Sequence, residues 1–311
     1  MTDFPHLEQR VAALSPERRR LLEKLKRRSS AEASEAGEPS RANALRLDNP
    51  VSVSDTKRLS REFYDNVSRQ LDSSPLGEYA MFLNYGYASN GAPEESPISL
   101  PARMLNRNTV KLVLELFGKV DPGGLEMLDV GCGRGGTAHV VNRHFHPKRF
   151  VGLDLAPEAV RYCRKAHPYP GFNFQVGDAE QLPFSENEFD VVTNIESSHN
   201  YPDVFAFLLG VHRVLRVGGR FLHTDNVPHE TWRASENYLR DLGMTLEHQR
   251  DITANVLLSC DETARLHRQA FTADNNPDTV NTFLAVPGSA IYEDMRSGKS
   301  AYRVLHWKRT N

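Results

Sequence analysis

The feature that most constrains the fold is an alternation of short apolar segments with helical segments, which begins at Leu125. Strands that alternate with helices form a parallel sheet whose two faces are covered by those helices. The pattern therefore predicts an α/β fold. The expected strands are Met127–Val130, Phe150–Asp154, Phe172–Val176, Asp190–Ile195 and Gly219–Thr224.

Helical patterns separate these strands and two later segments complete the sheet. Helices are expected from about Thr137, over Pro157–Ala166, over Val204–Leu215 and around Glu230–Asp241. Thr245–Asp251 and Tyr302–Trp307 are expected to add a late pair of strands. The prediction is a Rossmann-like, mostly parallel sheet of seven strands with helices on both faces.

Segments on either side of this alternation are expected to cover the sheet. Helices are predicted at Thr56–Leu71 and Asn108–Val120, with an aromatic stretch at Tyr79–Tyr87 between them. Residues 252–290 are mostly helical and not needed for the sheet, which favours a lid or substrate wall. We expect a helical N-terminal cap over 46–107, a cofactor-binding core over 108–251, a helical lid insertion over 252–290 and the final strand within 291–311.

Residues 1–45 differ in composition from the rest of the chain. Ser15-Pro16-Glu17 predicts a helix start, because Pro is favoured at the first helical position. The basic face of that helix could be a nucleic-acid or membrane patch, or simply a solvated surface. Residues 29–40 hold no large apolar side chain, which favours a solvated helix followed by a flexible linker between domains.

Charge and cysteine content exclude several classes of protein. The chain has 311 residues with 38 Lys+Arg against 40 Asp+Glu, a balance that argues against a general nucleic-acid binder. No apolar run approaches the roughly 18–20 residues of a membrane span, and the polar start lacks a signal sequence. The three cysteines are too scattered for a disulfide framework. We expect a cytoplasmic protein with neither nucleic-acid nor membrane partners.

A glycine-rich segment, Gly131–Gly136, follows the first strand directly and opens a helix in the pattern G-x-G-x-x-G. Glycines let the backbone turn sharply and approach a ligand closely. Asp154 ends the next strand, where an acid can hydrogen-bond both hydroxyls of a ribose. A nucleoside-containing cofactor is therefore expected; the alternative is a glycine turn with a capping aspartate. Arg134 is interpreted as a surface charge and Cys132 as a small loop residue.

Two further acids favour S-adenosylmethionine over a dinucleotide. Asp129 precedes the first glycine by two positions, where its carboxylate can face the methionine ammonium. Asp178 lies in Gly177–Phe184, at the carboxyl end of the third strand, where it can meet an adenine amino group. A nicotinamide-dependent dehydrogenase would not need this second motif.

The motifs together resemble the ordered set of class I S-adenosylmethionine-dependent methyltransferases. The segments that carry the resemblance are Leu128–Gly136, Leu153–Ala156, Gly177–Phe184, Phe189–Asn194 and Leu215–Phe221. The resemblance implies S-adenosylmethionine as cofactor and methyl transfer as reaction. Tyr64, Tyr85 and Tyr87 could cover the cofactor or pack within the cap. Cofactor contacts are expected from Asp129, Gly131, Cys132, Gly133, Gly136, Asp154, Leu155, Asp178, Ala179, Asn194, Tyr64 and Tyr85.

Asn194–Asp203 is similar to the segment after strand four of natural-product methyltransferases that act on hydroxyls, including sugar and phthiotriol O-methyltransferases. With Phe82–Tyr87 and the linker, the chain resembles the O-methyltransferase domains of modular polyketide synthases. That resemblance implies neighbouring synthase domains and an acyl carrier protein, with a phosphopantetheine-tethered substrate, as partners. The chain lacks the Asn-Pro-Pro-Tyr motif of nitrogen-methylating enzymes and the Asp-rich metal triad of catechol-type enzymes.

An aliphatic alcohol stays protonated at neutral pH, so its methylation calls for a general base. His199 lies just past the carboxyl end of the fourth strand, the edge where parallel sheets bind ligands. A neutral imidazole there can take the hydroxyl proton. Glu196, three residues earlier, is expected to hold the imidazole by its other nitrogen, with Asp225 as the competitor.

Several functions remain open at this point. His223, Asp225 and His229 could hold a metal, but a strand-end aspartate with two unrelated histidines is favoured and no metal site is expected. The leading function is O-methylation of the β-hydroxyl of an acyl-carrier-protein-bound polyketide intermediate. The alternatives are C-methylation of a β-ketoacyl thioester, O-methylation of a free sugar or lipid, and a catalytically dead cofactor-binding module.

Overall fold

The structure is a computed structural model that describes residues 52–73, 77, 79–91, 93–270 and 283–311. The chain divides into two units, and all of these residues belong to the second, Arg46–Asn311. The helix and linker expected within residues 1–45 lie outside the described residues. Within the described part of the chain, no helix has the length and apolar character needed to cross a membrane.

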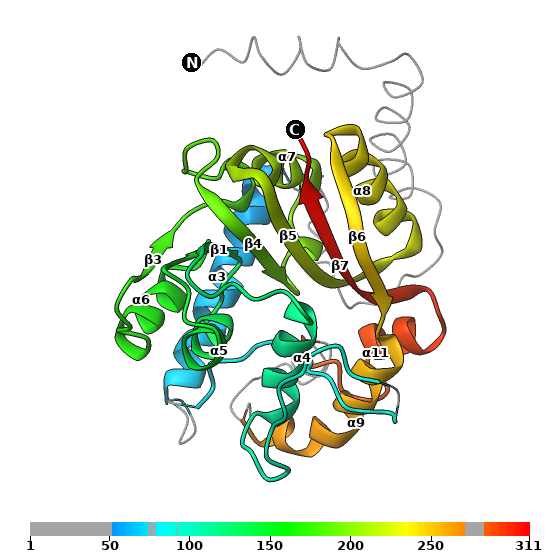
Figure 1. The fold of residues 1–311 in the computed structure, drawn as a ribbon. Helices are drawn as coiled ribbons and strands as arrows, with labels where there is room; N and C mark the ends of the chain where they lie inside the picture. The colour runs from blue at the N-terminus through cyan, green and yellow to red at the C-terminus, as the bar shows by residue number, and fades with distance from the viewer. Residues whose placement is uncertain (1–51, 74–76, 78, 92, 271–282) are drawn as a thin grey trace. The chain divides into compact units, whose positions relative to one another are not determined.

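A seven-stranded sheet with the order β3-β2-β1-β4-β5-β7-β6 forms the centre of the molecule (Figure 1). The strands are β1 (Glu126–Val130), β2 (Arg149–Asp154), β3 (Phe172–Val176), β4 (Phe189–Ile195), β5 (Leu215–Pro228), β6 (Met244–Asp251) and β7 (Ser300–Arg309). Strands β1 to β5 are parallel, whereas β7 runs antiparallel between β5 and β6. The predicted mostly parallel α/β sheet is confirmed.

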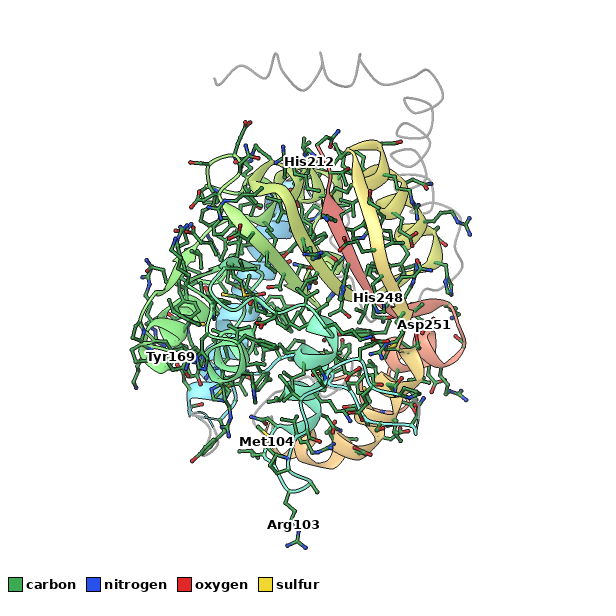
Figure 2. All side chains as sticks on the ribbon, in the orientation of Figure 1. Arg103, Met104, Tyr169, His212, His248 and Asp251 are labelled. Carbon is green, nitrogen blue, oxygen red and sulfur yellow. The ribbon has the colours of Figure 1, made fainter. Side chains whose placement is uncertain are left out.

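Helices cover both faces of the sheet because the central strands are apolar on both sides. One buried cluster joins Leu112, Val140 and Val160, while the other contains Phe207 and Trp232. Figure 2 shows the side chains that fill both layers. The helices are α3 (Val53–Ser73), α4 (Arg107–Phe117), α5 (Gly136–His144), α6 (Pro157–Ala166), α7 (Val204–Val214), α8 (His229–Asp241), α9 (Thr253–Ala270) and α11 (Ala290–Arg296), with short 3-10 turns η1 (Ala179–Gln181) and η2 (Ser198–Asn200).

Several boundaries differ from the expected ones for local reasons. Helix α4 ends at Phe117 rather than Val120, because Gly118 adopts a φ of 55° and leaves the helical conformation. Helix α11 occupies the start of the 291–311 stretch, and β7 extends the expected strand Tyr302–Trp307 to Ser300–Arg309. In Figure 1, α4, α9 and α11 gather at the end of the sheet toward which the arrow of β4 points.

The strand register brings the functional side chains to this same end. In β1 and β4, Asp129 pairs with Thr193, and in β4 and β5, Asn194 pairs with His223. Because these strands are parallel and adjacent, their carboxyl ends form one continuous edge. The residues just beyond that edge therefore face a common space.

Candidate functional site

The loop between β1 and α5 has a backbone conformation that glycine adopts readily. Gly131, Gly133 and Gly135 have φ values of 71°, 51° and 78°. A Cβ at Gly131 would lie 2.0 Å from the hydroxyl oxygen of Ser197, so any side chain there would collide with the chain beyond β4. Gly131–Gly136 is thus a tight turn held close to the ends of β1 and β4.

Asp129 lies beneath this loop with 2% of its surface exposed. Its Oδ1 accepts the Thr193 hydroxyl at 2.6 Å, but its Oδ2 is buried without a hydrogen-bond partner among the described residues. Burial raises the pKa of Asp129 to about 7, although the Thr193 hydroxyl acts in the opposite direction. An unpartnered buried carboxylate oxygen of this kind fits the ammonium group of a methionine moiety.

Asp154, at the end of β2, is tied to the backbone on both oxygens. Its Oδ2 accepts the Gly133 N–H at 2.8 Å and its Oδ1 accepts the Ala156 N–H at 2.9 Å. Burial raises the pKa of Asp154, opposed by these backbone donors. Each carboxylate oxygen has two lone pairs, so the predicted ribose contact stays compatible with both bonds. Leu155 follows directly in the β2–α6 turn.

Asp178, predicted to meet the adenine, is engaged by the cap helix α3. Its Oδ2 lies 2.7 Å from the Lys57 ammonium, and its Oδ1 accepts the Glu180 N–H at 2.9 Å. Lys57 also lies 2.6 Å from the Glu180 carboxylate. Ala179 opens the η1 turn beside them. The cap therefore reaches the side of the site assigned to the nucleoside.

A group of hydroxyl and amide side chains lies at the end of β4; Asn194 is one of the expected cofactor contacts, whereas Ser197 and Tyr201 were not predicted. The Asn194 amide donates to the Tyr201 hydroxyl at 3.1 Å, and the Ser197 hydroxyl lies 2.7 Å from that same oxygen. Asn194 Oδ1 is buried without a partner among the described residues. The spacing Ser197–Tyr201 across the short η2 turn is the only sequence signal for this cluster. With Asp129 Oδ2, it leaves two unpartnered polar atoms under the glycine-rich loop.

His199 and Asp225 form the pair that dominates the other half of the site. His199 Nδ1 lies 2.7 Å from Asp225 Oδ1, while His199 Nε2 accepts the Asn200 amide at 2.8 Å. This arrangement places the proton on Nδ1 and leaves the lone pair on Nε2. The His199 side chain is 29% exposed, whereas Asp225 is fully buried. Burial acts to lower the pKa of His199, but the Asp225 carboxylate outweighs it and raises that pKa.

Asp225 accepts four donors, which explains how its charge is kept inside the protein. Besides His199 Nδ1, they are the Ser198 hydroxyl at 2.6 Å, the His199 N–H at 3.0 Å and the Asn226 N–H at 2.8 Å. Burial alone would raise the pKa of Asp225, but the imidazoles of His199 and His223 and the Ser198 hydroxyl lower it to about 2. The residue is ionised at any physiological pH.

Glu196, expected to orient His199, takes a different role, and this expectation is corrected. Its φ of 47° is left-handed, and its Oε1 accepts the Tyr85 N–H at 2.8 Å together with the Tyr302 hydroxyl. Asp225, the competitor, holds the imidazole instead. Burial raises the pKa of Glu196 to about 8, so it links the cap to β7 largely in its protonated form at neutral pH.

The three cap tyrosines fall into different places. The Tyr64 hydroxyl accepts the Asn200 amide at 3.0 Å and so stands one residue away from the His199 ring. Tyr85 meets the site through its backbone, with its ring buried in the core. Tyr87 is 1% exposed and packs beside Arg250 as a core residue.

The possible metal set does not assemble. Burial lowers the pKa of His223 to about 4, and its Nε2 lies 2.9 Å from the Ser198 hydroxyl, while His229 begins α8. Among the described residues, no three His, Cys, Asp or Glu side chains are grouped so that they could hold a metal ion.

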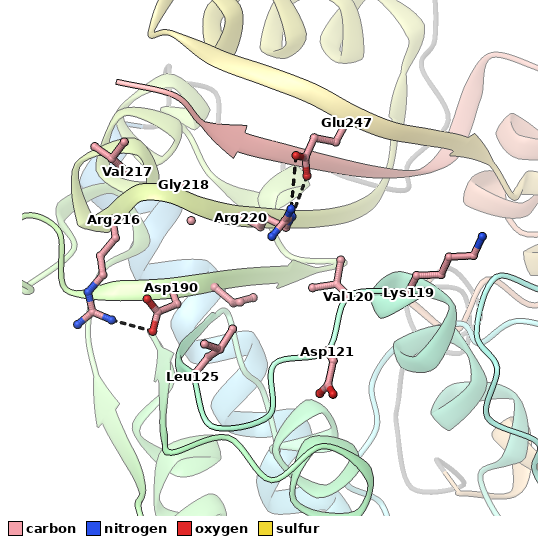
Figure 3. Close-up of a pocket in the computed structure, with 12 residues that line it drawn as sticks. Lys119, Val120, Asp121, Leu125, Asp190, Arg216, Val217, Gly218, Arg220 and Glu247 are labelled. Atoms are coloured by element: carbon pink, nitrogen blue, oxygen red, sulfur yellow. Dashed lines mark hydrogen bonds and ion pairs between the residues drawn. The ribbon is translucent and has the colours of Figure 1, made fainter.

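A cavity of about 580 Å³ lies at the opposite edge of the sheet, at the amino ends of β1, β4 and β5 (Figure 3). Its charged walls are paired, Arg216 with Asp190 at 2.7 Å and Arg220 with Glu247 at 2.7 Å. It contains none of the predicted site residues. Ligands of open parallel sheets bind at the carboxyl ends of the strands, so this cavity is not the cofactor site.

Comparison with known proteins identifies the chain. A family model described as a methyltransferase domain matches residues 128–223. Together with the sheet order and the glycine-rich loop, this defines a class I methyltransferase whose cofactor is S-adenosylmethionine, and the chain belongs to that family.

Mycobacterial lipid methyltransferases are among the proteins to which the chain is similar. The chain is 34% identical over 261 residues to the phthiotriol/phenolphthiotriol dimycocerosates methyltransferase of Mycobacterium tuberculosis, covering 81% of this chain and 93% of that protein. It is 36% identical over 230 residues to the fatty-acid O-methyltransferase of Mycolicibacterium smegmatis, covering 72% and 81%. These relatives are named for lipids and not as polyketide synthase domains.

Solved structures share the fold at low sequence identity. The [4+2]-cyclase SpnF superposes with a TM-score of 0.64 at 20% identity, covering 82% of this chain and 96% of that one. The geranyl diphosphate C-methyltransferase of Streptomyces coelicolor, solved with S-adenosyl-L-homocysteine, superposes with a TM-score of 0.58 at 15% identity, covering 84% and 100%. These likenesses establish the architecture.

Proposed function

We propose that the protein O-methylates a hydroxyl group on a lipid-like acyl chain, in its most specific form the β-hydroxyl of an acyl chain tethered to an acyl carrier protein. The observation that carries the proposal is the His199–Asp225 pair. A hydroxyl must lose a proton as it is methylated, so it needs a positioned acceptor. A carboxylic acid is already ionised at neutral pH and needs none.

The chemistry of the side chains follows from their hydrogen bonds. S-adenosylmethionine, when bound, would supply the methyl group from its sulfonium, and the sulfur leaves as a neutral thioether that needs no proton. Asp225 keeps the proton of His199 on Nδ1, so the lone pair on Nε2 can accept a proton once the Asn200 amide, which donates to it in this structure, is displaced. The Asn200 amide marks the place where a substrate hydroxyl would donate to Nε2. As the hydroxyl oxygen gains its methyl group, the proton moves to Nε2, and Asp225 stabilises the resulting imidazolium.

Aromatic side chains next to the dyad support an apolar substrate. The rings of Phe63 and Tyr64 lie 5.2 Å apart, and Phe283 lies 5.5 Å from Phe63 and 6.2 Å from Tyr64. Phe283 in turn packs against the buried cluster of Leu284 and Val286. Relatives named as a fatty-acid O-methyltransferase and a phthiotriol/phenolphthiotriol dimycocerosates methyltransferase also support an apolar, lipid-like substrate.

The test is a panel in which one acyl chain is presented in several chemical forms. A β-hydroxyacyl chain is offered as carrier-protein thioester, as pantetheine thioester and as free acid, beside a β-ketoacyl thioester and a chain without a hydroxyl. Mass spectrometry after incubation with S-adenosylmethionine locates any added methyl group. Mild alkali then distinguishes an ether, which survives, from a methyl ester, which is hydrolysed.

An alkali-stable methyl group on the β-hydroxyacyl forms supports the proposal, and preference for the carrier-bound form supports the carrier protein as partner. Methylation of the free acid alone, as an alkali-labile ester, overturns it in favour of a carboxyl acceptor. Methylation of the β-ketoacyl thioester alone establishes C-methylation instead. Equal use of a free hydroxylated lipid supports the hydroxyl acceptor and removes the carrier protein.

A further inference from the structure

Arg134 lies inside the glycine-rich loop, and its interpretation as a surface charge is wrong, because the side chain is completely buried. Burying a guanidinium is costly unless its N–H groups find acceptors. Here they do. Its partners are the carbonyl oxygens of Ala80 (2.6 Å from Nε), Ser68 (3.1 Å from Nη1) and Gly77 (3.1 Å from Nη2), the Asp72 carboxylate (2.9 Å from Nη1) and the Tyr162 ring (3.5 Å to its centroid).

Most of these partners belong to one element, the last part of helix α3 and the chain just after it. Ser68 and Asp72 lie in the final turns of α3, while Gly77 and Ala80 follow it. Arg134 is a further donor to the Ser68 carbonyl inside the helix, and it satisfies the carbonyls of Gly77 and Ala80, which lie beyond the end of the helix. One side chain of the glycine-rich loop thus ties together the last turns of α3 and the chain that follows it.

The same face of α3 contacts both halves of the site. Lys57, Tyr64 and Ser68 are separated by seven and four residues, which places them on one side of a helix. Lys57 pairs with Asp178 on the nucleoside side, and the Tyr64 hydroxyl holds the Asn200 amide against His199. The position of α3 therefore affects both groups of residues.

We propose that Arg134 is a positioning residue that couples the cofactor loop to the catalytic dyad through helix α3. When the loop is held around the cofactor, Arg134 fixes the end of α3, and α3 in turn fixes Tyr64 and Lys57 over the site. Cofactor binding and the placement of Tyr64 and Asn200 next to the dyad are then set together. This role concerns cofactor and dyad and does not depend on which acyl acceptor is used.

The first test replaces the fork-shaped donor with a single ammonium in Arg134→Lys, which keeps the charge but cannot reach three carbonyls at once. We expect S-adenosylhomocysteine, measured by calorimetry, to bind about tenfold more weakly, within the usual range for coupled sites. We also expect hydrogen exchange across 53–73 to lose the protection that S-adenosylhomocysteine confers on the unsubstituted protein. At saturating cofactor, kcat stays below that of the unsubstituted enzyme.

Arg161→Met is the matched control. Arg161 pairs with the other oxygen of Asp72 at 3.0 Å and with Glu158 at 2.7 Å; its side chain is 59% exposed, and its partners among the described residues do not include the glycine-rich loop. It removes an ion pair from the same carboxylate without disturbing the loop. Its affinity for S-adenosylhomocysteine and its exchange pattern should match those of the unsubstituted protein.

Asp72→Asn is a second test, in case Arg134→Lys does not fold. Asp72 is partly exposed, and the asparagine amide has the same shape as the carboxylate that it replaces. A weakening of about threefold in affinity, with partial loss of the induced protection, supports the coupling. A folded Arg134→Lys with unchanged affinity and unchanged induced protection overturns it, even if its melting temperature falls, because stability alone is then affected. If only Asp72→Asn folds, unchanged values there overturn it.

Discussion

Two aspartates at the same edge of the sheet, Asp129 after β1 and Asp225 after β5, are both buried yet titrate at opposite extremes. Burial raises the pKa of Asp129 to about 7, whereas the pKa of Asp225 is lowered to about 2. The difference lies in their donors. Asp225 accepts four, while Asp129 has an oxygen with no hydrogen-bond partner among the described residues.

The comparison divides the site into a half that the chain completes and a half that a ligand completes. Around Asp225, the protein supplies every compensating group, so the dyad is organised before any substrate arrives. Around Asp129, one carboxylate oxygen has no partner among the described residues, and the prediction is that the ammonium of S-adenosylmethionine supplies the compensating charge. Substitutions in each half should therefore have distinct effects on catalysis, cofactor affinity and stability.

His199→Ala removes the proton acceptor and should produce the largest loss. We expect kcat to fall by about 10²–10⁴-fold, the usual contribution of a general base. The affinity for S-adenosylhomocysteine should change less than twofold, because His199 belongs to the half that holds no cofactor. Steady-state kinetics and calorimetry measure the two effects. Near-full turnover on the accepted substrate would show that the base lies elsewhere.

Asp129→Asn tests the predicted role of Asp129 in binding the ammonium group of the cofactor. Loss of one charge-assisted hydrogen bond, about 1.5–3 kcal/mol, should weaken S-adenosylhomocysteine binding by about 10–100-fold. In the unsubstituted protein, affinity should rise as pH increases through about 7, because only the ionised Asp129 pairs with an ammonium. Calorimetry from pH 5.5 to 8.5 measures this slope. A variant that retains the full slope would assign it to another group.

The same substitution should stabilise the cofactor-free protein. The folded-state pKa of Asp129, about 7, lies above its ordinary 3.8, so ionisation at higher pH opposes folding. We expect Asp129→Asn to add about 1–2 kcal/mol to the free energy of unfolding at pH 8, a gain that shrinks as pH falls from 7 toward 4. Urea denaturation at pH 4, 6 and 8 measures it. A gain independent of pH would contradict this cause.

Ser198→Ala removes one of the four donors to Asp225 and should have the smallest effect. One hydrogen bond is worth about 1 kcal/mol, so kcat should fall only about two- to fivefold. A carboxylate with fewer donors attracts the imidazolium more strongly, so the acid limb of kcat should move to higher pH. The pH–rate profile measures this. Ser197→Ala, whose hydroxyl contacts Tyr201, should leave the limb in place; equal shifts in both variants would refute the assignment.

The features predicted from the sequence are those that depend on local backbone geometry. Gly131–Gly136 and the alternation of strands and helices are readable because turn conformation and periodicity are properties of adjacent residues. His199 is also predictable, because a polar residue just past a parallel strand lies at the ligand-binding edge. The roles of these residues in binding and catalysis stay predictions.

The partner of His199 was harder to predict because it depends on contacts between strands. Glu196 is nearer in sequence, but its left-handed backbone and the Tyr302 hydroxyl hold it elsewhere. Asp225 reaches His199 because β4 and β5 are adjacent, with Ile195 opposite Thr224. The burial of Arg134 was not predicted for a related reason, since it depends on contacts with α3, the chain after it and the Tyr162 ring, all distant in sequence.

The position of strand β7 means that the sheet can be completed only after the end of the chain has been synthesised. It is the last strand of the chain, yet it lies inside the sheet, where it pairs with both β5 and β6 and brings Tyr302 to Glu196. Until residues 300–309 have left the ribosome, β5 is an open edge and β6 has no neighbour in the sheet. A nascent chain stopped before Ser300 would therefore expose an unpaired strand edge. Such an edge is prone to pair with other chains, so we expect the truncated chain to bind chaperones and to be inactive.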